Sequence, residues 1–450
     1  MLFNSKNFLI FGLSKSGYCA AKELIKLNAN CFIYEENSNV YQSGNVDELI
    51  SLGAKKVESA SVFELLNSID VLVISPGVAI NHSICLKARE LKIRIIGELE
   101  LGYLLIKSPI IAVTGTNGKT TTVSIINKIL EKADLSHELV GNIGVPITSK
   151  VDKLQDYNAF AITEVSSFQL ETIHNFTPHI ACVLNITPDH LERHYTMENY
   201  VYLKARILKN LRESEYAVLN ADDERVVAFA KNLKAKIIWI SLKNLTANAR
   251  YEDGVFYYNN AKVGAFNNPI LKGEHNVYNV LFAISVAKII GIDDEVISSA
   301  INEYKGEKHR IEFIGKYNGV YYYNDSKSTN TGATISALKT IKTPTILLLG
   351  GKEKGENYDV LFDEIKKSKV KAVIICGEST FNMTQIAIKY GIKNIHVVDG
   401  FEDAVSIADF LAIEGDSVLL SPACSSFDRF SGYAERGEYF CELVKKLEEV

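Results

Sequence analysis

Short apolar runs alternate along the chain with segments whose apolar residues recur every three or four positions. Continuous apolar runs of this length are typical of strands that are buried on both faces of a parallel sheet, and the intervening segments have the period of helices. The pattern therefore predicts an α/β protein with mostly parallel sheets and helices on both sheet faces. The clearest strand candidates are residues 8–11, 31–34, 70–77 (which ends in a turn), 110–114, 159–163, 180–185, 320–323, 345–349, 372–375 and 417–420.

The type of pattern changes twice, which indicates three domains. Residues 1–97 read as a Rossmann-like unit, and residues 307–450 again alternate strand and helix in a Rossmann-like way. Residues 98–306 are mixed: parallel-type strands come first, and short alternating runs between 235 and 264 then suggest β-hairpins. We expect helices near 197–211 and directly after 273–276. The central domain is predicted to be an ATPase-like mixed sheet, for the reason given next.

One strand runs directly into Gly115-Thr116-Asn117-Gly118-Lys119-Thr120, and an amphipathic segment follows. Strand, glycine loop and helix form a phosphate loop, in which backbone N–H groups and the helix N-terminus bind an oxyanion. Lys119 would meet the outer phosphates, and the Thr120 hydroxyl would bind Mg2+. The common G-x-x-x-x-G-K-[ST] loop has its first glycine where this chain has Val113, so an ordinary glycine-rich turn is the alternative.

Composition limits the classes of function. The chain has 450 residues, 47% of them hydrophobic, and 23% charged, which fits an ordinary globular protein of roughly two to four domains. A net charge of −5 argues against a general nucleic-acid or membrane-surface binder. No apolar run reaches the roughly 18 residues that span a bilayer, and the start of the chain lacks the layout of a signal peptide. Seven scattered cysteines without a C-x-x-C pair favour reduced thiols in the cytoplasm.

Two further motifs of the central region could carry chemistry. Glu164 ends a strand, where its carboxylate could bind the Mg2+ that bridges two phosphates; position alone equally allows a glutamate that caps Ser166 or Ser167. His190 and His194 are four residues apart, as zinc ligands on a helix are, but the glutamate of H-E-x-x-H is in the wrong place for a zinc protease. We interpret His190 as a ligand or hydrogen-bond partner near the phosphates.

Three polar loops of the last domain follow strand candidates, at residues 324–332, 350–355 and 421–428. Parallel strands end at one edge of their sheet, so these loops should line one ligand site. The first loop is rich in hydrogen-bonding side chains, and the second is a cationic glycine loop suited to a carboxylate. Cys424, in the third, has no evident base partner, so we interpret it as a packed thiol.

Other polar residues have simple structural explanations. Lys204 would by default be a solvated helix lysine, and Asn276 suits a helix N-cap. Arg310 could clamp a phosphate or form a surface ion pair. The loop at residues 12–17 has the pattern G-x-x-x-x-G, which is weak evidence for NAD, although a ligand crevice at the strand ends is still expected.

Taken together, several segments resemble the Mur ligase family, in the family's order and across nearly the whole chain. Residues 164–170, 324–330 and 421–428 resemble those members that add D-glutamate to UDP-N-acetylmuramoyl-L-alanine. The segments that carry the family resemblance are residues 115–120, 164–170, 185–190, 273–276, 309–310 and 324–330.

The resemblance implies a UDP-substrate-binding domain at 1–97, an ATP-binding domain at 98–306 and an amino-acid-binding domain at 307–450. It implies that ATP phosphorylates the L-alanyl carboxylate and that the D-glutamate amine attacks the acyl phosphate, as a step in peptidoglycan precursor synthesis. We expect a cytoplasmic monomer that acts on small-molecule substrates, with neither nucleic acid nor membrane as a partner.

The resemblance also assigns roles to residues. Catalytic roles fall to Lys119, His190 and Lys204, the last as a carbamate. Two Mg2+ ions would be held by Thr120, Glu164, His190 and carbamylated Lys204. ATP would be bound by Gly115, Thr116, Asn117, Gly118, Lys119, Thr120, Thr121, Asn276, Arg310, Asp325 and Lys327. The UDP-linked substrate would be bound by Ser14, Lys15, Ser16, Ser75, Pro76, Gly77, Asn142 and Ser166. D-Glutamate would be bound by Thr329, Lys354, Ser426 and Phe427.

Departures and alternatives remain. The second strand ends in Glu35-Glu36, where the family usually has an aspartate and a hydroxyl, and the aromatic Tyr433 is shifted by one residue. A sister ligase of the family, a folylpolyglutamate-type ligase and a non-catalytic nucleotide-sugar sensor are the alternatives. The UDP-type N-terminal unit argues against a folylpolyglutamate-type ligase. The intact set of Lys119, Glu164, His190 and Lys204 argues against a non-catalytic sensor.

Overall fold

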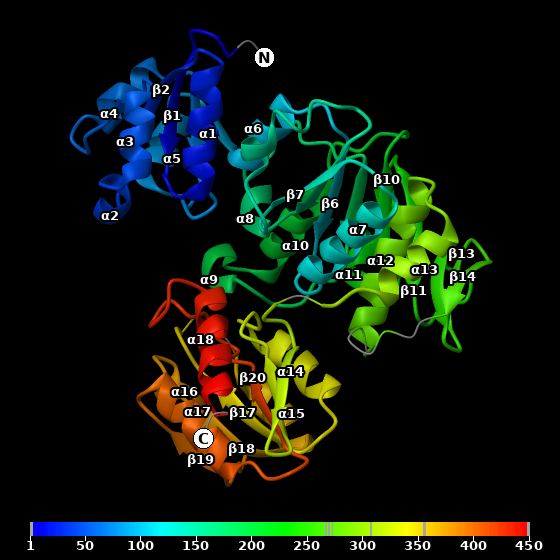
Figure 1. Cartoon of the computed structure of the whole chain (residues 1–450). Coiled ribbons are helices and arrows are strands. Elements are labelled where there is room, and N and C mark those ends of the chain that lie inside the picture. The colour runs from blue at the N-terminus through cyan, green and yellow to red at the C-terminus, as the bar shows by residue number, and fades with distance from the viewer. Residues whose placement is uncertain are drawn as a thin grey trace. The chain divides into compact units, whose positions relative to one another are not determined.

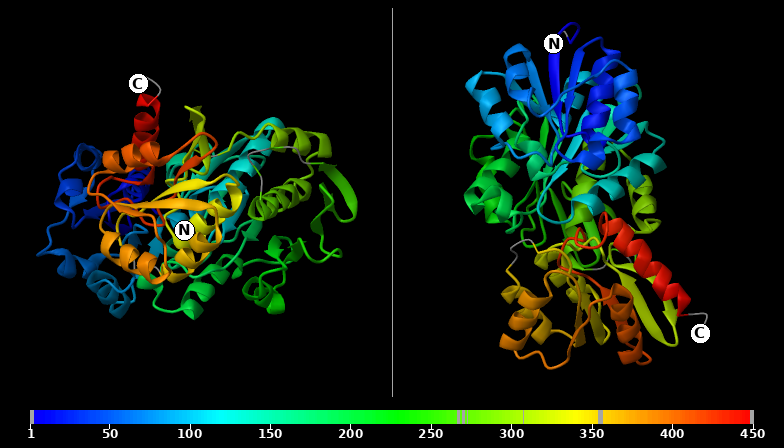
Figure 2. Two further views of the ribbon diagram at one scale, coloured as in Figure 1. Left: turned by 90° about the horizontal axis from the view of Figure 1, so that it is seen from below. Right: turned by 90° about the vertical axis from the view of Figure 1, so that its left-hand side faces the viewer.

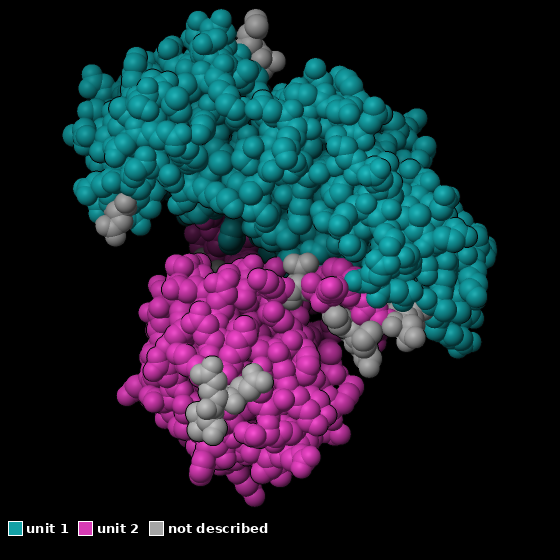
Figure 3. All heavy atoms as spheres, viewed as in Figure 1, with its two compact units in different colours: residues 1–186, 196–267, 278–303 teal, residues 187–195, 268–277, 304–450 magenta. Residues whose placement is uncertain are grey.

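The computed structural model describes residues 3–265, 268, 271, 273–306, 308–353 and 357–447. The described residues form sheets of five, nine and six strands, one within each predicted domain (Figure 1). Contacts group the chain into two compact units (Figure 3), and unit 1 holds the first two sheets while unit 2 holds the third. Unit 1 comprises residues 1–186, 196–267 and 278–303, and unit 2 comprises residues 187–195, 268–277 and 304–450.

The first sheet is parallel throughout, with the strand order β3-β2-β1-β4-β5. Its winding reverses between β1 and β4, so the loops after these strands meet at the switch point where such sheets bind ligands. Helices α1 and α3 cover one face, and α4 and α5 cover the other. The elements are β1 Asn7–Phe11, α1 Lys15–Lys26, β2 Asn30–Tyr34, α2 Ser38–Tyr41, α3 Gly44–Ser51, β3 Lys55–Lys56, α4 Val62–Leu65, η1 Leu66–Ser68, β4 Val71–Ile74, α5 Ser83–Glu90 and β5 Arg94–Gly97.

The second sheet has the order β14-β13-β12-β11-β10-β9-β6-β8-β7. Its strands are β6 Ile110–Thr114, β7 His137–Gly141, β8 Phe160–Glu164, β9 Ile180–Val183, β10 Tyr216–Asn220, β11 Lys236–Ser241, β12 Ala249–Glu252, β13 Val255–Tyr258 and β14 Ala261–Ala265. The hairpin prediction is wrong for β11, which pairs in parallel with both β10 and β12. Among the described strands of this sheet, only β12, β13 and β14 form antiparallel pairs. Alternating apolar residues report which face of a strand is buried, and they carry no information on its direction.

The helices between and beside these strands follow the same chain order. They are α7 Lys119–Lys132, η2 Ile147–Lys150, α8 Ser167–Leu170, α9 Leu191–His194, α10 Met197–Ala205, η3 Arg206–Leu208, α11 Glu224–Val227, η4 Ala228–Asn232, α12 Glu274–Ile289 and α13 Asp294–Asn302. Helix α9 belongs to unit 2. Among the described residues, none of the helices combines the length and the apolar character needed to cross a bilayer.

The third sheet has the order β15-β16-β20-β17-β18-β19 and is parallel except for β15. Because β16, β20 and β17 are adjacent, the prediction that the three polar loops share one sheet edge is confirmed. Helices α17 and α18 cover one face, and α14, α15 and α16 cover the other (Figures 1 and 2). The elements are β15 Glu312–Tyr317, β16 Val320–Asn324, α14 Thr331–Thr340, β17 Thr345–Leu349, α15 Asp359–Lys367, β18 Val370–Ile375, α16 Thr380–Lys389, β19 Ile395–Val397, α17 Phe401–Leu411, β20 Ser417–Leu420 and α18 Tyr433–Lys446.

Helix α6 (Glu98–Leu105) joins the first two sheets of unit 1. Leu101 lies in the core of the first sheet, and Leu99 lies in the core of the second. Two carboxyl groups of α6 are buried, at 2% exposure for Glu98 and 0% for Glu100. A buried carboxyl group is tolerated only where hydrogen bonds replace its hydration.

Those hydrogen bonds come from the central domain. Glu98 accepts from the backbone N and the Oγ1 of Thr148, at 2.8 and 2.7 Å. Glu100 accepts from the successive backbone N–H groups of residues 174–176 at 2.9, 2.8 and 3.0 Å, and Arg94 lies 3.3 Å from it. The pairing fixes the first sheet against the second.

The buried position of Glu98 predicts a pH dependence of stability. Burial raises the pKa of Glu98 to about 7, from an ordinary value of about 4.3. The folded state therefore holds this proton more tightly than the unfolded chain does, and the resulting stability is complete below about pH 4 and is lost as the pH rises through about 7. We expect Glu98→Gln to gain up to roughly 3 kcal/mol relative to the wild type between about pH 5 and about pH 8.

Denaturant unfolding at both pH values measures this difference. Glu64→Gln, at an exposed position of the same unit, is the matched control and should show no such trend. A free-energy difference between wild type and Glu98→Gln that stays constant across this pH range would contradict the prediction.

Candidate active site

The predicted order of strand, glycine loop and helix at residues 110–132 is confirmed. Strand β6 ends at Thr114 and α7 begins at Lys119. Gly118 has a φ of +87°, and a Cβ there would lie 2.3 Å from Asn279 Oδ1. Gly115, at φ +155°, would place a Cβ 2.9 Å from that of Leu184. Both positions therefore require glycine.

Residues far away in the sequence hold this loop in place. The Asn185 side chain accepts from the backbone N of Asn117 at 2.9 Å and donates to its carbonyl at 3.0 Å. The hydroxyls of Thr116 and Tyr200 lie 3.1 Å apart, in hydrogen-bonding contact. Neither Asn185 nor Tyr200 was assigned a role from the sequence, although Asn185 ends a strand candidate and begins the 185–190 segment that carries the family resemblance.

Two lysine ammonium groups converge on one carbonyl oxygen. Lys119 Nζ donates to the carbonyls of Gly115 and Thr116 at 2.8 and 2.7 Å, and Lys204 Nζ donates to Gly115 O at 2.7 Å. Lys204 is only 1% exposed, so its interpretation as a solvated lysine is wrong. Helix α10 turns this side chain under the loop, beside the ring of Tyr200 at 5.2 Å.

Glu164 faces the start of α7. It is 2% exposed and accepts from Thr120 Oγ1 at 2.8 Å and from Asn142 Nδ2 at 2.7 Å. The capping alternative for Glu164 is wrong, because Ser166 N-caps α8 in a capping box with Gln169. A carboxylate and a hydroxyl are the hard oxygen donors that Mg2+ prefers.

The loop is thus equipped for a polyanion with a hard cation. The backbone N–H groups at the start of α7, the helix dipole and two ammonium groups favour phosphate. Within the described ranges, no three His, Cys, Asp or Glu side chains gather as a metal cage. A cation at Thr120 and Glu164 would therefore take further ligands from the phosphates and water, as Mg2+ commonly does.

His190 lies in unit 2, whereas the phosphate loop lies in unit 1. His190 has a left-handed backbone with φ 54°, and its Nε2 lies 3.6 Å from Asp189. Asp189 also accepts from Asn330 Nδ2 at 3.5 Å. This links His190 to the end of the first polar loop of the third sheet.

That first loop surrounds a buried carboxyl group. Asp325 is 0% exposed, accepts from Ser421 Oγ at 2.7 Å, and lies 3.8 Å from Arg310. Burial raises the pKa of Asp325, while Arg310 and its hydrogen bonds act in the opposite direction. Arg310 also donates to Ser328 Oγ at 3.0 Å. Of the two alternatives for Arg310, the ion pair is present, although its partner is a buried carboxyl group.

The other residues assigned to ATP in unit 2 lie close by in sequence or sit on α12. Lys327 Nζ lies 5.4 Å from the centre of the Tyr433 ring. Asn276 is the third residue of α12 and is buried, so the prediction that it is the N-cap is wrong. Burial, followed by the charge of Arg310, lowers the pKa of the neighbouring His275 to about 4.

The residues assigned to D-glutamate differ in exposure. Thr329 is half-buried, Ser426 is 1% exposed and Phe427 is 65% exposed. Lys354 lies outside the described residues. The nearby Cys424 is 1% exposed, and burial raises the pKa of its thiol to about 11. The interpretation of Cys424 as a packed thiol is therefore confirmed.

Arg436 on α18, which no sequence pattern singled out, lies beneath these loops and is 2% exposed. Its guanidinium donates to Ser326 Oγ and O at 2.9 and 2.8 Å, to Cys424 O at 3.1 Å and to Ser425 O at 3.3 Å. It thus connects the first and third polar loops. An arginine inside a helical pattern gave no signal of this role.

The residues assigned to the UDP part meet at the switch point of the first sheet. Ser75 Oγ donates to Gly12 O at 2.7 Å, which joins the loops after β4 and β1. Ser14 and Ser16 stand at the start of α1, and Lys15 Nζ donates to Gly144 O at 2.7 Å. Where the family pattern has an aspartate, Glu35 accepts from the backbone N of Leu13 at 2.7 Å and of Asn37 at 2.9 Å. Glu35 therefore stabilises the loop that follows β1.

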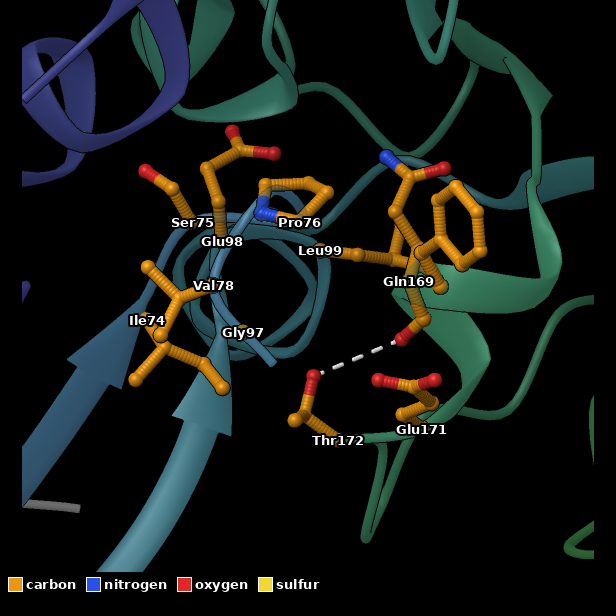
Figure 4. Close-up of a pocket in the computed structure, with 11 residues that line it drawn as sticks. Ile74, Ser75, Pro76, Val78, Gly97, Glu98, Leu99, Gln169, Glu171 and Thr172 are labelled. Atoms are coloured by element: carbon orange, nitrogen blue, oxygen red, sulfur yellow. Dashed lines mark hydrogen bonds between the residues drawn. The ribbon is translucent and has the colours of Figure 1, made fainter. Parts of the chain in front are cut away.

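A narrow pocket of about 10 Å³ opens next to these residues, within unit 1, which is about the space of one water molecule. Figure 4 shows Ser75, Pro76 and Glu98 from the first sheet and α6 on one side, and Gln169 and Thr172 on the other. Gly77 follows Pro76 in the same loop. The pocket combines an apolar lining with a few polar groups, and its volume is far below that of a small-molecule site.

Comparison with known proteins identifies the family. The chain matches the Mur ligase middle domain over residues 113–287 and the Mur ligase, glutamate ligase domain over residues 309–424. It is 39% identical to the UDP-N-acetylmuramoylalanine–D-glutamate ligase of Caldanaerobacter subterraneus subsp. tengcongensis, with 99% of this chain and 100% of that protein covered. It is 40% identical to the protein of the same name from Thermoanaerobacter sp. strain X514, with the same coverage.

A solved structure supports the fold. The UDP-N-acetylmuramate-alanine ligase from Thermotoga maritima superimposes with a TM-score of 0.63, at 16% identity over 98% of this chain and 99% of that chain. At this identity the likeness concerns the fold alone. The full-length relatives, the two matched domains and the phosphate loop of β6 and α7 lead to one conclusion: the chain belongs to the Mur ligase family, with the UDP-N-acetylmuramoylalanine–D-glutamate ligases.

Proposed function

We propose that this chain joins D-glutamate to UDP-N-acetylmuramoyl-L-alanine in an ATP-dependent reaction of peptidoglycan precursor synthesis. The observation that carries the proposal is the match, over the whole length, to relatives named for this ligation. The geometry of the phosphate loop supports it, because a carboxylate must be activated before an amine can displace one of its oxygens.

The proposed reaction has two steps. An oxygen of the L-alanyl carboxylate attacks the γ-phosphorus of ATP, the bond to the bridging oxygen breaks, and ADP leaves an acyl phosphate behind. The D-glutamate amine then attacks the carbonyl carbon. The tetrahedral intermediate expels inorganic phosphate, the amine loses a proton, and the amide remains. The protein mainly positions the reactants and stabilises charge.

Lys119 and the backbone N–H groups at the start of α7 would bind the ATP phosphates. Lys119 Nζ bonds two neutral carbonyls of its own loop, and a phosphate oxygen is a stronger, charged acceptor. Thr120 and Glu164 would hold one Mg2+, which when bound neutralises charge on the phosphates. Asn142, which donates to Glu164, and Ser166 would approach the muramoyl substrate.

Lys204 is proposed to be carbamylated and thereby able to meet Mg2+, and His190 is proposed to ligate a second Mg2+. A carbamate converts the ammonium into an anion, which a cation can bind. Its burial at 1% exposure and its contact with the Gly115 carbonyl support a role for Lys204 at the phosphate site. The role of His190 rests on the family resemblance.

The remaining assignments also rest on the resemblance and on positions at strand ends. We assign the UDP part to Ser14, Lys15, Ser16, Ser75, Pro76 and Gly77, the rest of ATP to Thr121, Asn276, Arg310, Asp325 and Lys327, and D-glutamate to Thr329, Lys354, Ser426 and Phe427. We further propose that the enzyme acts as a monomer in the cytoplasm, and light scattering of the purified protein tests the oligomeric state.

The first prediction concerns substrate dependence. Phosphate release should require ATP, Mg2+, UDP-N-acetylmuramoyl-L-alanine and D-glutamate together, and leaving out any one should reduce it to background. L-Glutamate is the matched control, since only its configuration differs. Robust turnover with a different amino acid and none with D-glutamate would move the chain to a sister activity, and ligand binding without turnover would favour a sensor.

The second prediction concerns the phosphate loop. Lys119→Ala should lower kcat at least about 100-fold, because a charged donor to the transferred phosphoryl group is removed. Lys128→Ala, on the same helix and paired with Glu131 at the surface, should keep near-normal activity. Steady-state phosphate release measures both variants, and an active Lys119→Ala enzyme would refute the phosphate role.

The third prediction concerns the carbamate. Lys204→Ala should lose activity, and short carboxylic acids should restore part of it by supplying the missing anion. Wild-type protein in 13C-bicarbonate should show a carbamate carbon signal by NMR that is absent from Lys204→Ala and present in Lys209→Ala, an exposed control. Full activity of Lys204→Ala, or the same NMR spectrum for both lysine variants, would contradict carbamylation of Lys204.

A further inference from the structure

The second and third polar loops of unit 2 are joined at several points. Lys352 donates its backbone N–H to Ser425 O at 2.9 Å, in an isolated antiparallel bridge. Ser379 at the start of α16 donates its backbone N–H to Gly351 O at 2.9 Å. The third loop contains Ser426 and Phe427, to which the proposed function assigns D-glutamate. The hydrogen bonds to the second loop therefore help to decide where these two residues lie.

A buried tyrosine adds a side-chain link between the same loops. Tyr358, at 0% exposure just before α15, donates its hydroxyl to Glu353 Oε1 at 3.0 Å. The hydroxyl also lies 3.0 Å from Cys424 Sγ. The Cys424 thiol lies 3.4 Å from Ser379 Oγ as a second acceptor. The bonds thus run from the second loop through Tyr358 to the third loop and to α16.

The Tyr358 hydroxyl is a polar group in an apolar core. The Tyr358 ring belongs to a core cluster with Leu361, Phe362, Met383 and Cys424. A phenylalanine would fill the same space, and a buried hydroxyl is unfavourable unless it is hydrogen-bonded. Burial raises the pKa of Tyr358 well above its ordinary value and that of Cys424 to about 11, so both keep their protons at neutral pH. The connection between the loops therefore consists of a neutral hydroxyl and a neutral thiol, and the Glu353 carboxylate accepts the hydrogen bond from Tyr358.

We propose that Tyr358 is a positioning residue for the amino-acid substrate. Its hydroxyl connects residues 350–353 to residues 421–428 and holds the third loop, with Ser426 and Phe427, in position for D-glutamate. The identity of the ligand rests on the proposed function, whereas the link between the loops does not. Tyr358 touches other protein groups, so it acts through the loops.

Tyr358→Phe removes only the hydroxyl. It should raise the KM for D-glutamate roughly 3- to 10-fold, the effect of about one hydrogen bond. The KM for ATP, the KM for the UDP-linked substrate and kcat should stay within about twofold. This split distinguishes positioning of one substrate from a general loss of structure.

Tyr322→Phe is the matched control. Tyr322 is also 0% exposed, and its hydroxyl donates to the carboxylate of Asp409 near the end of α17, away from the polar loops. Both variants lose a buried tyrosine–carboxylate bond and should lose similar stability. Only Tyr358→Phe should raise the KM for D-glutamate.

A second pair of variants tests the link from the other side. Cys424→Ser keeps a hydrogen-bonding group and should retain a near-normal KM for D-glutamate, whereas Cys424→Ala should resemble Tyr358→Phe. Hydrogen exchange at the Lys352 amide, which bonds Ser425 O, should speed up in Tyr358→Phe and Cys424→Ala and stay unchanged in Tyr322→Phe. This measurement requires no substrate.

The possible outcomes distinguish a failure of the positioning role of Tyr358 from a failure of the proposed function. An unchanged KM for D-glutamate in folded Tyr358→Phe, or an equal rise in Tyr322→Phe, would overturn the positioning role. Lys352 exchange that stays at the wild-type rate would overturn the link. If the wild type turns over a different amino acid, the proposed function fails, and the KM for that amino acid then decides the role of Tyr358.

Discussion

The convergence of two lysines on the Gly115 carbonyl is the constraint around which the central domain is arranged. Lys119 and Lys204 lie within two hydrogen-bond lengths of each other. Two like charges at such a separation repel by about 3 kcal/mol at an effective dielectric constant of about 20. A bound phosphate would attract both ammonium groups and so offset their mutual repulsion. A carbamate on Lys204 would remove it in a different way, by reversing one of the two charges.

Two neighbouring ammonium groups stay this close only where the backbone of the phosphate loop cannot move away. The loop lies between β9 and β8 at the end of β6, and Asn185 holds Asn117 through both its amide atoms. Gly118 leaves room for Asn279. The first sheet is held to this frame by the buried carboxyl groups of α6. Rigid packing therefore keeps the charged groups together before any ligand arrives.

The sequence predicted those parts of this arrangement that are local. Uninterrupted apolar runs revealed the buried strands, and the Gly115 to Thr120 pattern revealed the phosphate loop, because both depend on neighbouring residues. The burial of Lys204 depends on how α10 packs under a loop 89 positions away, and no local pattern reports such packing. The same holds for Asn185 and Asn117, which are 68 positions apart, and for the direction of β11.

In the third sheet, a buried cation and neutral hydrogen-bonding groups lie under the loops to which we assign D-glutamate. Arg436 is fixed by the Ser326 hydroxyl and the carbonyls of Ser326, Cys424 and Ser425. Burial lowers the pKa of its guanidinium to about 10, so it still carries a full charge at neutral pH. A cation held by carbonyl groups keeps most of its field for a ligand, whereas one paired with a carboxylate would be neutralised. Arg436 thus supplies a positive field beneath the loops, and neutral hydrogen bonds such as those of Tyr358 connect the loops that would place a dicarboxylate in that field.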